Sequence, residues 1–477
     1  MPDNPGPLSR RDPTQGWLYI VLAVAVLLRL GLMLSLLDNP RNFVQSDAPG
    51  YDVIALNLIN HRAFSGDADA PFQPDAFRTP VYPLFLAGIY AVFGHAYAVA
   101  VFVQCLISVV SVYLVFRLGR QMIGPTAGAA AALLTAVDAG LIIHANLLLT
   151  ETLFTLLLIL ALTALWRFTQ TRQARYGVMC GVWLGLATLC RPVTQYLVFG
   201  FAAILLVAIR PRWRRGLQAA VVLILAYTAS VSPWLIRNWL TFGTPQVSSI
   251  QGYNLFVFNA SYLQAQLDHT TLEEAQAGLS KQIEPQLAAA GDNQFEQAAV
   301  YQAAALQIIG QHPLDYLRLH IQGAVLMLML PNTNFLANMY GILSVQTGLI
   351  ANLRTRTLTE NFQALLQFFQ SYLSSSPKQA IFLIALIVEM ITLLITYGLA
   401  LIGTASLIRS KRWLLLAVLM IMLIYFAALT GPVGYGRYRV PISPVLALLA
   451  GAGLAAYLNR RKSRTPVSKE FTPSSTG

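Results

Sequence analysis

Residues Ser46–Gly94 read SDAPGYDVIALNLINHRAFSGDADAPFQPDAFRTPVYPLFLAGIYAVFG and form a polar segment between two hydrophobic ones. The segment gathers carboxylates, arginines and aromatic residues in one loop, as binding and reaction sites do. Its last part, VYPLFLAGIYAVFG, is apolar over only about 14 residues, which is short for a membrane span and typical of an interfacial or re-entrant helix. The stretch therefore predicts a polar site laid on a membrane surface.

Composition places the chain in a lipid bilayer. Of its 477 residues, 56% are hydrophobic and 11% are charged, whereas about a quarter of the residues of a soluble protein are charged. The net charge of +12 comes from short basic clusters between apolar runs, which excludes the aromatic-interleaved basic surface of a nucleic-acid partner. The cysteines Cys105, Cys180 and Cys190 lie within apolar runs, as packing residues do, and predict neither disulfides nor a zinc site.

About ten apolar runs are long enough to span a bilayer as helices. They cover residues 17–37, 96–116, 124–143, 149–166, 176–191, 193–209, 216–235, 379–404, 413–430 and 440–458. The first run is longer than the core of a signal peptide and lacks a cleavage site, so we expect a retained helix. Every second connection is rich in Lys and Arg, as cytoplasmic loops are. We therefore expect a multi-pass protein of the plasma or inner membrane, with both termini in the cytoplasm.

The expected organisation has four parts. Residues 1–236 form a membrane module of seven spans with the outer loop 38–95, and residues 237–378 form an outer region of amphipathic helices. Residues 379–462 form a module of three spans, and the Ser, Thr and Pro-rich residues 463–477 form a disordered cytoplasmic tail. We assign the apolar piece at 320–331 to the membrane surface, because spanning would demand a second crossing to preserve the charge alternation.

Ionisable residues inside the expected spans are costly and tend to mark function. Asp138, Glu151 and Arg191 gather at the outer face in the expected orientation. Arg29 and Glu389 lie nearer mid-depth, where an ion pair or a hydrogen bond to the backbone competes with a catalytic role. A structural contact between helices remains the alternative for Asp138 and Arg191 as well.

The first outer loop offers a candidate general base. Asp47 lies just beyond the first span and before ALNLINHRAF, whose apolar spacing predicts a short helix on the membrane. A carboxylate held there can accept a proton from an incoming hydroxyl group. Asp52, five residues later, is a second candidate, whereas Asp67, Asp69 and Asp75 lie among Gly, Ala and Pro, as turn residues do.

The last outer connection, GPVGYGRYRVPISP, carries Arg437 and Arg439 on either side of Tyr438. Guanidinium groups bind phosphate oxygens through bidentate, charge-assisted hydrogen bonds. Two outward-facing arginines depart from the distribution of basic residues elsewhere in the chain, which favours a phosphate ligand. Snorkelling of both side chains at the membrane interface is the alternative.

Four motifs together resemble those of the lipid-phosphate-dependent membrane glycosyltransferases of the GT-C fold, in particular glycosyltransferase family 39 and the lipopolysaccharide-core galacturonosyltransferases. They are SDAPGYDVIALNL, FRTPVYPLFLAGIYAVFG, LLLTETLFTLLLILAL and GYGRYRVPISPVLALLAGAGLA. The resemblance implies an all-α, GT-C-like bundle of about ten transmembrane helices with interfacial helices in the first outer loop. Asp47 is followed by Ala48 where several relatives carry an Asp-Glu pair, so the chain resembles the core-polysaccharide branch more than the protein O-mannosyl branch.

The resemblance also implies roles for the candidate residues. Asp47 matches the catalytic aspartate of the first outer loop, and Glu151 matches the acidic residue that opens the fourth span near the active site. The resemblance places Arg78, Arg437 and Arg439 near the donor phosphate, and Arg191 and Tyr438 are two further candidates for binding it. Further candidates for the site are Tyr51, Asp52 and Asp138.

The implied reaction moves a sugar with inversion from a polyprenyl-phosphate donor to a hydroxyl acceptor of the cell envelope, on the outer face of the membrane. It requires no cofactor. A divalent metal is allowed, but only Asp67-Ala68-Asp69 offers a match, and a weak one. A transporter or flippase of a lipid-linked or polar substrate is the alternative; ten spans and mid-depth charges favour it, and the lack of an inverted repeat disfavours it.

Overall fold

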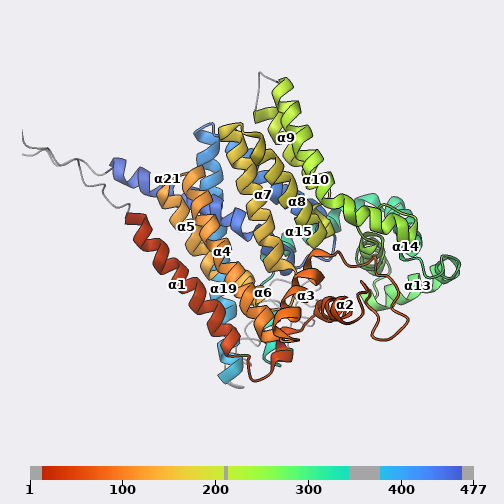
Figure 1. Ribbon diagram of the computed structural model, residues 1–477. Helices are drawn as coiled ribbons and strands as arrows, with labels where there is room; N and C mark the ends of the chain where they lie inside the picture. The colour runs from red at the N-terminus through yellow and green to blue at the C-terminus, as the bar shows by residue number, and fades with distance from the viewer. Residues whose placement is uncertain (1–12, 209–212, 343–376, 465–477) are drawn as a thin grey trace, which may run out of the picture.

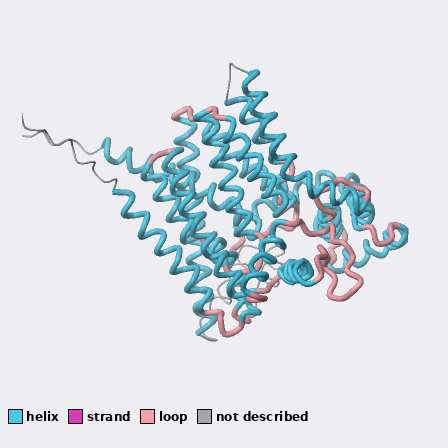
Figure 2. The backbone as a smooth tube through the Cα atoms, viewed as in Figure 1, coloured by secondary structure: helices cyan, strands magenta, loops and turns pink. Residues whose placement is uncertain are grey.

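The computed structural model describes residues 13–208, 213–342 and 377–464, and in these ranges the chain consists of helices and loops without strands (Figure 2). The α-helices are α1 (Pro13–Leu34), α2 (Ala48–Asn60), α3 (Val81–Phe93), α4 (Tyr97–Met122), α5 (Pro125–Val137), α6 (Ala139–Ala145), α7 (Glu151–Thr171), α8 (Ala174–Cys190), α9 (Leu197–Ala208), α10 (Trp213–Phe242), α11 (Ile250–Asn254), α12 (Ser261–Leu267), α13 (Leu272–Ala289), α14 (Gln294–Gln311), α15 (Pro313–Met329), α16 (Thr333–Met339), α19 (Pro377–Arg409), α20 (Trp413–Leu429) and α21 (Ser443–Arg464). Short helical segments of other types are η1 (Pro40–Phe43), η2 (Pro192–Thr194), η3 (Leu255–Ala260) and η4 (Gly436–Ile442). The all-α fold class is confirmed.

The long apolar helices form a bundle, with α2 and α3 near one end of it and α13 and α14 to one side (Figure 1). In the described ranges six helices are long and apolar enough to cross a membrane, or seven if the bent pair α5 and α6 is one span. The expected count of about ten spans is therefore not confirmed. Three further expected spans, at 176–191, 193–209 and 413–430, fall on shorter apolar helices of 10–17 residues. The chain is an integral membrane protein.

The expected span at 124–143 is broken. Helices α5 and α6 meet at an angle of 54°, because Asp138 ends α5 and accepts a hydrogen bond from the backbone N–H of Leu141 at 2.8 Å as the N-cap of α6. The carbonyl groups left at the end of α5 accept hydrogen bonds from Arg29, at 2.9 Å for Ala136 and 3.3 Å for Thr135. Arg29 and Asp138 therefore satisfy the two helix ends that the break leaves inside the bundle.

Other boundaries also differ from the expected ones. The helix expected over 55–64 begins at Ala48 and ends at Asn60, because Pro49 in its first turn suits a helix start. Helix α10 runs to Phe242, past the expected boundary at 236. Of the expected tail at 463–477, the first two residues belong to α21, and residues 465–477 lie outside the described residues.

The outer region expected at 237–378 is helical where the structure describes it, and its residues 343–376 lie outside the described residues. Helices α13 and α14 pack through a small apolar core of their own, formed with η3 by Phe256, Ala260, Leu279, Ile283 and Ala305. The apolar piece at 320–331 forms the second half of α15, which ends before Pro331, and α15 is not among the six long apolar helices of the described residues.

Candidate active site

Four segments that are distant in the sequence meet at one end of the bundle. Asp47 follows α1, Glu151 begins α7, Arg191 ends α8, and Arg437 lies in η4 just before α21. Arg437 bonds both Asp47 and Glu151, and Arg191 bonds Glu151. Alternating helix directions carry these four residues to the same end of the bundle, as the sequence-based orientation requires.

Asp47 stands at the N-cap of α2 but makes no capping hydrogen bond with its side chain. Its carboxylate instead accepts a hydrogen bond at 3.1 Å from Nη2 of Arg78 and one at 2.8 Å from Nη1 of Arg437. The preceding residue, Ser46, has a φ of 56°, a left-handed conformation that is uncommon outside glycine. An aspartate that could cap its helix is thus turned toward two guanidinium groups.

Glu151 is fully buried at the start of α7. Its Oε1 atom accepts hydrogen bonds from both Arg191 and Arg437, whereas Oε2 is buried without a partner in the described chain. Two cations compensate one buried carboxylate here, as a buried charge requires. Arg437 is the link in this arrangement, because its Nε atom bonds Glu151 while its Nη1 atom bonds Asp47.

The side chain of Arg78 packs against two aromatic rings. Its guanidinium carbon lies 4.7 Å from the ring centre of Tyr51 and 5.1 Å from that of Phe77, within the range of cation–π contacts. Oδ1 of Asp75 accepts the backbone N–H of Arg78 at 2.7 Å. Asp75 therefore stabilises the turn that presents Arg78, and Tyr51 and Arg78, both candidates from the sequence, lie in the site.

The electrostatic balance of the site keeps Asp47 ionised. Partial burial of the carboxyl opposes ionisation, but the charges of Arg437 and Arg78 outweigh it, so that the pKa of Asp47 is lowered from its ordinary value of 3.8. Burial acts on Arg78 in the direction of a lower pKa, yet the neighbouring Tyr51 and Asp47 raise its pKa above the ordinary value. At neutral pH the site thus holds a carboxylate that is a proton acceptor and cations that suit an anion.

Asp52 lies in a different cluster. It accepts hydrogen bonds from the hydroxyl groups of Tyr90 at 2.8 Å and Tyr97 at 2.9 Å, and it lies 2.9 Å from Nε2 of His95. These contacts connect α2 to α3 and α4. The structure therefore gives Asp52 a role in joining helices and does not bring it together with Asp47 and Glu151.

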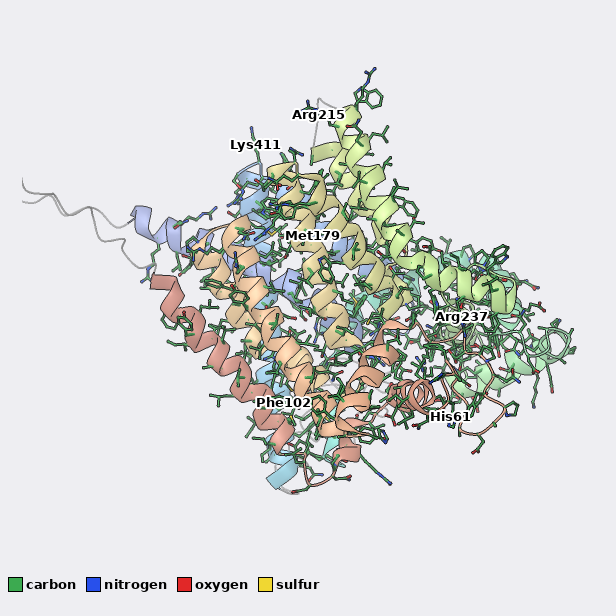
Figure 3. The ribbon with its side chains drawn as sticks, in the orientation of Figure 1. His61, Phe102, Met179, Arg215, Arg237 and Lys411 are labelled. Carbon is green, nitrogen blue, oxygen red and sulfur yellow. The ribbon has the colours of Figure 1, made fainter. Side chains whose placement is uncertain are left out.

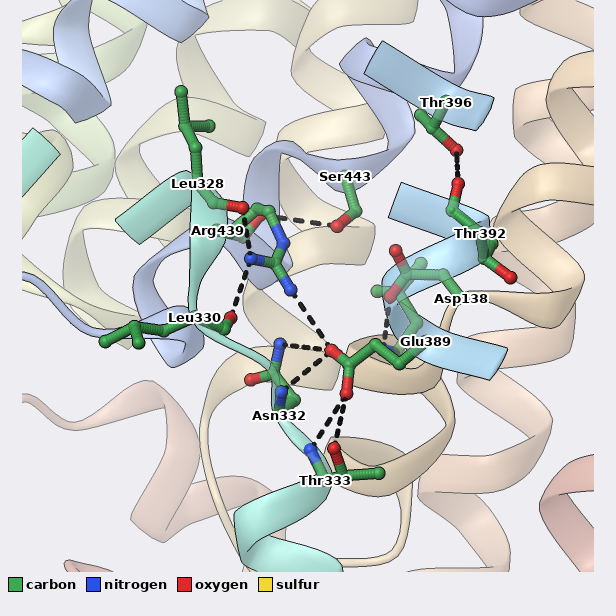
Figure 4. Close-up of polar contacts among 12 residues, drawn as sticks. Asp138, Leu328, Leu330, Asn332, Thr333, Glu389, Thr392, Thr396, Arg439 and Ser443 are labelled. Atoms are coloured by element: carbon green, nitrogen blue, oxygen red, sulfur yellow. Dashed lines mark hydrogen bonds and ion pairs between the residues drawn. The ribbon is translucent and has the colours of Figure 1, made fainter. Parts of the chain in front are cut away.

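Arg439 also lies apart from Arg437, in the cluster of Figure 4. Its Nη1 atom donates to the carbonyl groups that end α15, those of Met327, Leu328 and Leu330, at 2.8–3.0 Å. Its Nη2 atom bonds Glu389 at 3.2 Å. Glu389 in turn accepts the backbone N–H groups of Asn332 at 2.7 Å and Thr333 at 2.9 Å, at the start of α16.

The expected pairing of Arg437 and Arg439 at one phosphate is therefore not what the structure shows. Arg439 and Glu389 satisfy the carbonyl and N–H groups left by the break between α15 and α16, as Arg29 and Asp138 do between α5 and α6. Asp138 accordingly acts as a helix cap. Tyr438 is 36% exposed and packs edge-on against Tyr435, 6.3 Å between ring centres.

Sequence reasoning missed one member of the site, Ser46, whose Oγ atom lies 3.2 Å from Nη1 of Arg437. A serine before an aspartate carries no sequence signal of its own. In the described residues no group of three or more His, Cys, Asp or Glu side chains is arranged to hold a metal ion. The two carboxylates of the site, those of Asp47 and Glu151, form ion pairs with guanidinium groups.

Comparisons with known proteins bear on the family and the fold of the chain. The family described as dolichyl-phosphate-mannose-protein mannosyltransferase matches residues 77–236, and a search of curated proteins found no significant match. The oligosaccharyltransferase AglB from Archaeoglobus fulgidus, in complex with an inhibitory peptide and a dolichol-phosphate, has a TM-score of 0.53 at 14% identity over 97% of this chain and 52% of that one. The same enzyme in complex with Zn and sulfate has a TM-score of 0.50 at 16% identity, over 94% of this chain and 50% of that one.

ArnT from Cupriavidus metallidurans bound to undecaprenyl phosphate has a TM-score of 0.41 at 15% identity, over 96% of this chain and 82% of that one. This chain spans about half the length of the oligosaccharyltransferase chains that it matches. Identities this low show a shared fold rather than a shared activity. The chain has the fold of the GT-C membrane glycosyltransferases, and the resemblance indicated by its sequence motifs is confirmed.

Proposed function

We propose that this protein is an inverting glycosyltransferase that moves a sugar from a polyprenyl-phosphate donor to a hydroxyl acceptor on the outer face of the membrane. The observation that carries the proposal is the bridge made by Arg437 between Asp47, at 2.8 Å, and the buried Glu151. Asp47, whose side chain is 36% exposed, is bonded by the guanidinium groups of Arg78 and Arg437, and that of Arg191 bonds Glu151. The dolichol-phosphate described for the archaeal oligosaccharyltransferase supports a lipid-phosphate donor.

In the proposed reaction Asp47 accepts the proton of the acceptor hydroxyl, and the oxygen attacks the anomeric carbon of the sugar from the face opposite the phosphate. The bond between that carbon and the phosphate oxygen breaks, and polyprenyl phosphate leaves with the electron pair. Arg437, Arg78 and Arg191 stabilise the charge that develops on the phosphate. No general acid is needed, since the leaving group is already a stable anion.

The donor phosphate competes with Asp47 for the same cations. Arg78 and Arg437 bond the two oxygens of Asp47, and a phosphate that takes over either guanidinium group frees a carboxylate oxygen for the acceptor. Glu151 keeps Arg437 near the site during this exchange, because it is buried and remains paired with Arg191. Binding of the donor thus prepares the base.

The distribution of basic residues supports an outward-facing site. Arg215 and Lys411, from two basic connections, lie at one end of the bundle, and His61, at the end of α2, lies toward the other (Figure 3). Short loops rich in Lys and Arg stay in the cytoplasm. The end that carries Asp47 is therefore proposed to face outward, where a nucleotide sugar would be absent and a lipid-linked sugar present.

The test incubates the purified chain with a panel of polyprenyl-phosphate sugars and an envelope extract as acceptor, and measures released polyprenyl phosphate. Asp47→Asn should lower turnover by roughly 10² or more, the scale of a lost catalytic base, with donor binding retained. Asp69→Asn is the matched control, because Asp69 is an exposed carboxylate of the same loop. Equal turnover by wild type and Asp47→Asn would refute the role of Asp47, and substrate flux into sealed vesicles without bond cleavage would favour a transporter.

A further inference from the structure

A groove of about 450 Å³ lies in the outer helical region, between α12, α13 and α14. Five of its fifteen lining residues are glutamines, and two more, Asp268 and Glu274, carry carboxylates. No Lys or Arg of the described ranges lines it. The side-chain amides of Gln282, Gln307 and Gln311 are exposed there and make no hydrogen bond within the described parts of the chain, so they are available to a ligand.

The base of the groove is formed by well-packed apolar side chains. Phe256, Leu279 and Ile283 line it from below and belong to the apolar core shared by η3, α13 and α14. Phe256 is 1% exposed. Polar walls above a packed apolar floor give a concave surface whose hydrogen-bonding groups are carried by helices rather than by loops, as in preformed binding sites.

The lining selects the chemistry of a ligand. A glutamine amide offers two donors and an acceptor, and a carboxylate accepts from neighbouring hydroxyl groups, so the walls match a polyhydroxyl compound. Residues 261–311 hold six Asp or Glu residues and one lysine, in a chain whose net charge is +12. That local excess of negative charge disfavours phosphorylated or uronate-bearing ligands. We propose that the groove binds an uncharged oligosaccharide portion of the acceptor.

The groove is connected to the candidate active site through aromatic contacts. Phe77, next to Arg78, lies edge-on to Tyr253 at 5.4 Å; Tyr253 contacts Tyr301 at 5.7 Å, and Tyr301 contacts Phe256 at 5.3 Å. In addition, the side chain of Gln294 accepts the backbone N–H of Ala76 at 2.8 Å. The groove is thus fixed relative to Arg78 but separated from it, as a subsite for a distal part of a chain-like acceptor would be.

Two glycines allow a direct test. A Cβ atom added at Gly278, which lines the groove, or at Gly310, which does not, meets no heavy atom of the described chain within 4 Å. Leucine at either position also suits a helix better than glycine. Gly278→Leu therefore adds an apolar side chain to the lining of the groove from a position with free space around its Cβ, and Gly310→Leu is its matched control. Gln307→Ala and Gln302→Ala, both exposed on α14, form a second pair in which only the first removes a lining amide.

The experiment measures binding of the full chain in detergent to immobilised neutral oligosaccharides and to the same chains carrying uronate residues. Wild type and Gly310→Leu should retain neutral chains in preference to uronate chains. Gly278→Leu should bind them about tenfold more weakly, since it blocks several amide hydrogen bonds, and Gln307→Ala should show a smaller loss than Gly278→Leu. Retention by Gly278→Leu equal to wild type, a preference for uronate chains, or no retention of any neutral chain would each overturn the proposal.

As an acceptor subsite the groove rests on the proposed function, and two readouts keep the two proposals separate. Release of polyprenyl phosphate by wild type without retention of any neutral oligosaccharide refutes the groove alone. Retention of neutral oligosaccharides that Gly278→Leu weakens about tenfold, together with no release of polyprenyl phosphate from any donor, refutes the proposed function alone.

Discussion

Replacing Arg437 by lysine keeps the positive charge of η4 but removes the fork that joins Asp47 to Glu151. The guanidinium group bonds Glu151 through Nε and bonds both Asp47, at 2.8 Å, and Ser46, at 3.2 Å, through Nη1. An ammonium group is a single point charge on a flexible stem and does not reproduce this planar geometry. It can stay with the buried Glu151 or reach the accessible Asp47, but not hold both in one geometry.

The magnitude follows from the bonds that are lost. One or two charge-assisted hydrogen bonds, at about 1.5–3 kcal/mol each, disappear from the site and from the donor phosphate. A loss of about 3 kcal/mol in the transition state corresponds to about 10²-fold in kcat/KM for the donor. Glu151 retains Arg191, so we expect the Arg437→Lys chain to stay folded.

The assay follows release of polyprenyl phosphate over a range of donor concentrations, with thermal unfolding in detergent as the check on folding. Arg117→Lys is the matched control, because Arg117 lies on α4 at the end away from Asp47 and bonds Tyr113. A folded Arg437→Lys protein with kcat/KM within a few fold of wild type would refute the reasoning, since a point charge would then serve as well as the fork.

Three further predictions concern pH, the helix break and metal. The pKa of Asp47 is lowered from 3.8, so its ion pairs stabilise the fold at neutral pH and lose this effect only as the pH falls below 3.8. The difference in Tm between wild type and Asp47→Asn should therefore shrink below pH 3.8. A difference in Tm that does not depend on pH would contradict the ion pairs. Glu389→Gln leaves Arg439 buried without its counter-charge and should cost about 3–5 kcal/mol of stability, measured by unfolding in detergent; an unchanged Tm would argue against the capping pair. Chelation by EDTA should leave turnover intact, since guanidinium groups supply the positive charge at the phosphate. Turnover that is lost on chelation and restored by a divalent ion would show that the reaction depends on a metal.

The meeting of Asp47, Glu151, Arg191 and Arg437 could be predicted because each lies at the end of an apolar run. Successive spans cross the membrane in opposite directions, so the end of one span and the start of the next lie on the same side. The order of the spans therefore predicts that these four residues lie at the same end of the bundle. The number of helices long enough to span was harder to predict. Asp138, in the run at 124–143, is an N-cap, and a cap in mid-run marks a break that hydropathy alone does not resolve.

Errors at the level of single residues came from the direction in which side chains point. Asp52 follows Asp47 by five positions, which turns it about 140° around a helix at 100° per residue, so the two carboxylates cannot share a ligand once α2 begins at Ala48. Arg437 and Arg439 are separated by two positions in a 3-10 turn, where about 120° per residue directs them to different sides of η4. One therefore reaches Glu151 and the other Glu389. The sequence predicts at which end of the bundle these residues lie. Their bonding partners depend on whether a short segment forms an α-helix or a 3-10 helix, and tertiary packing determines that.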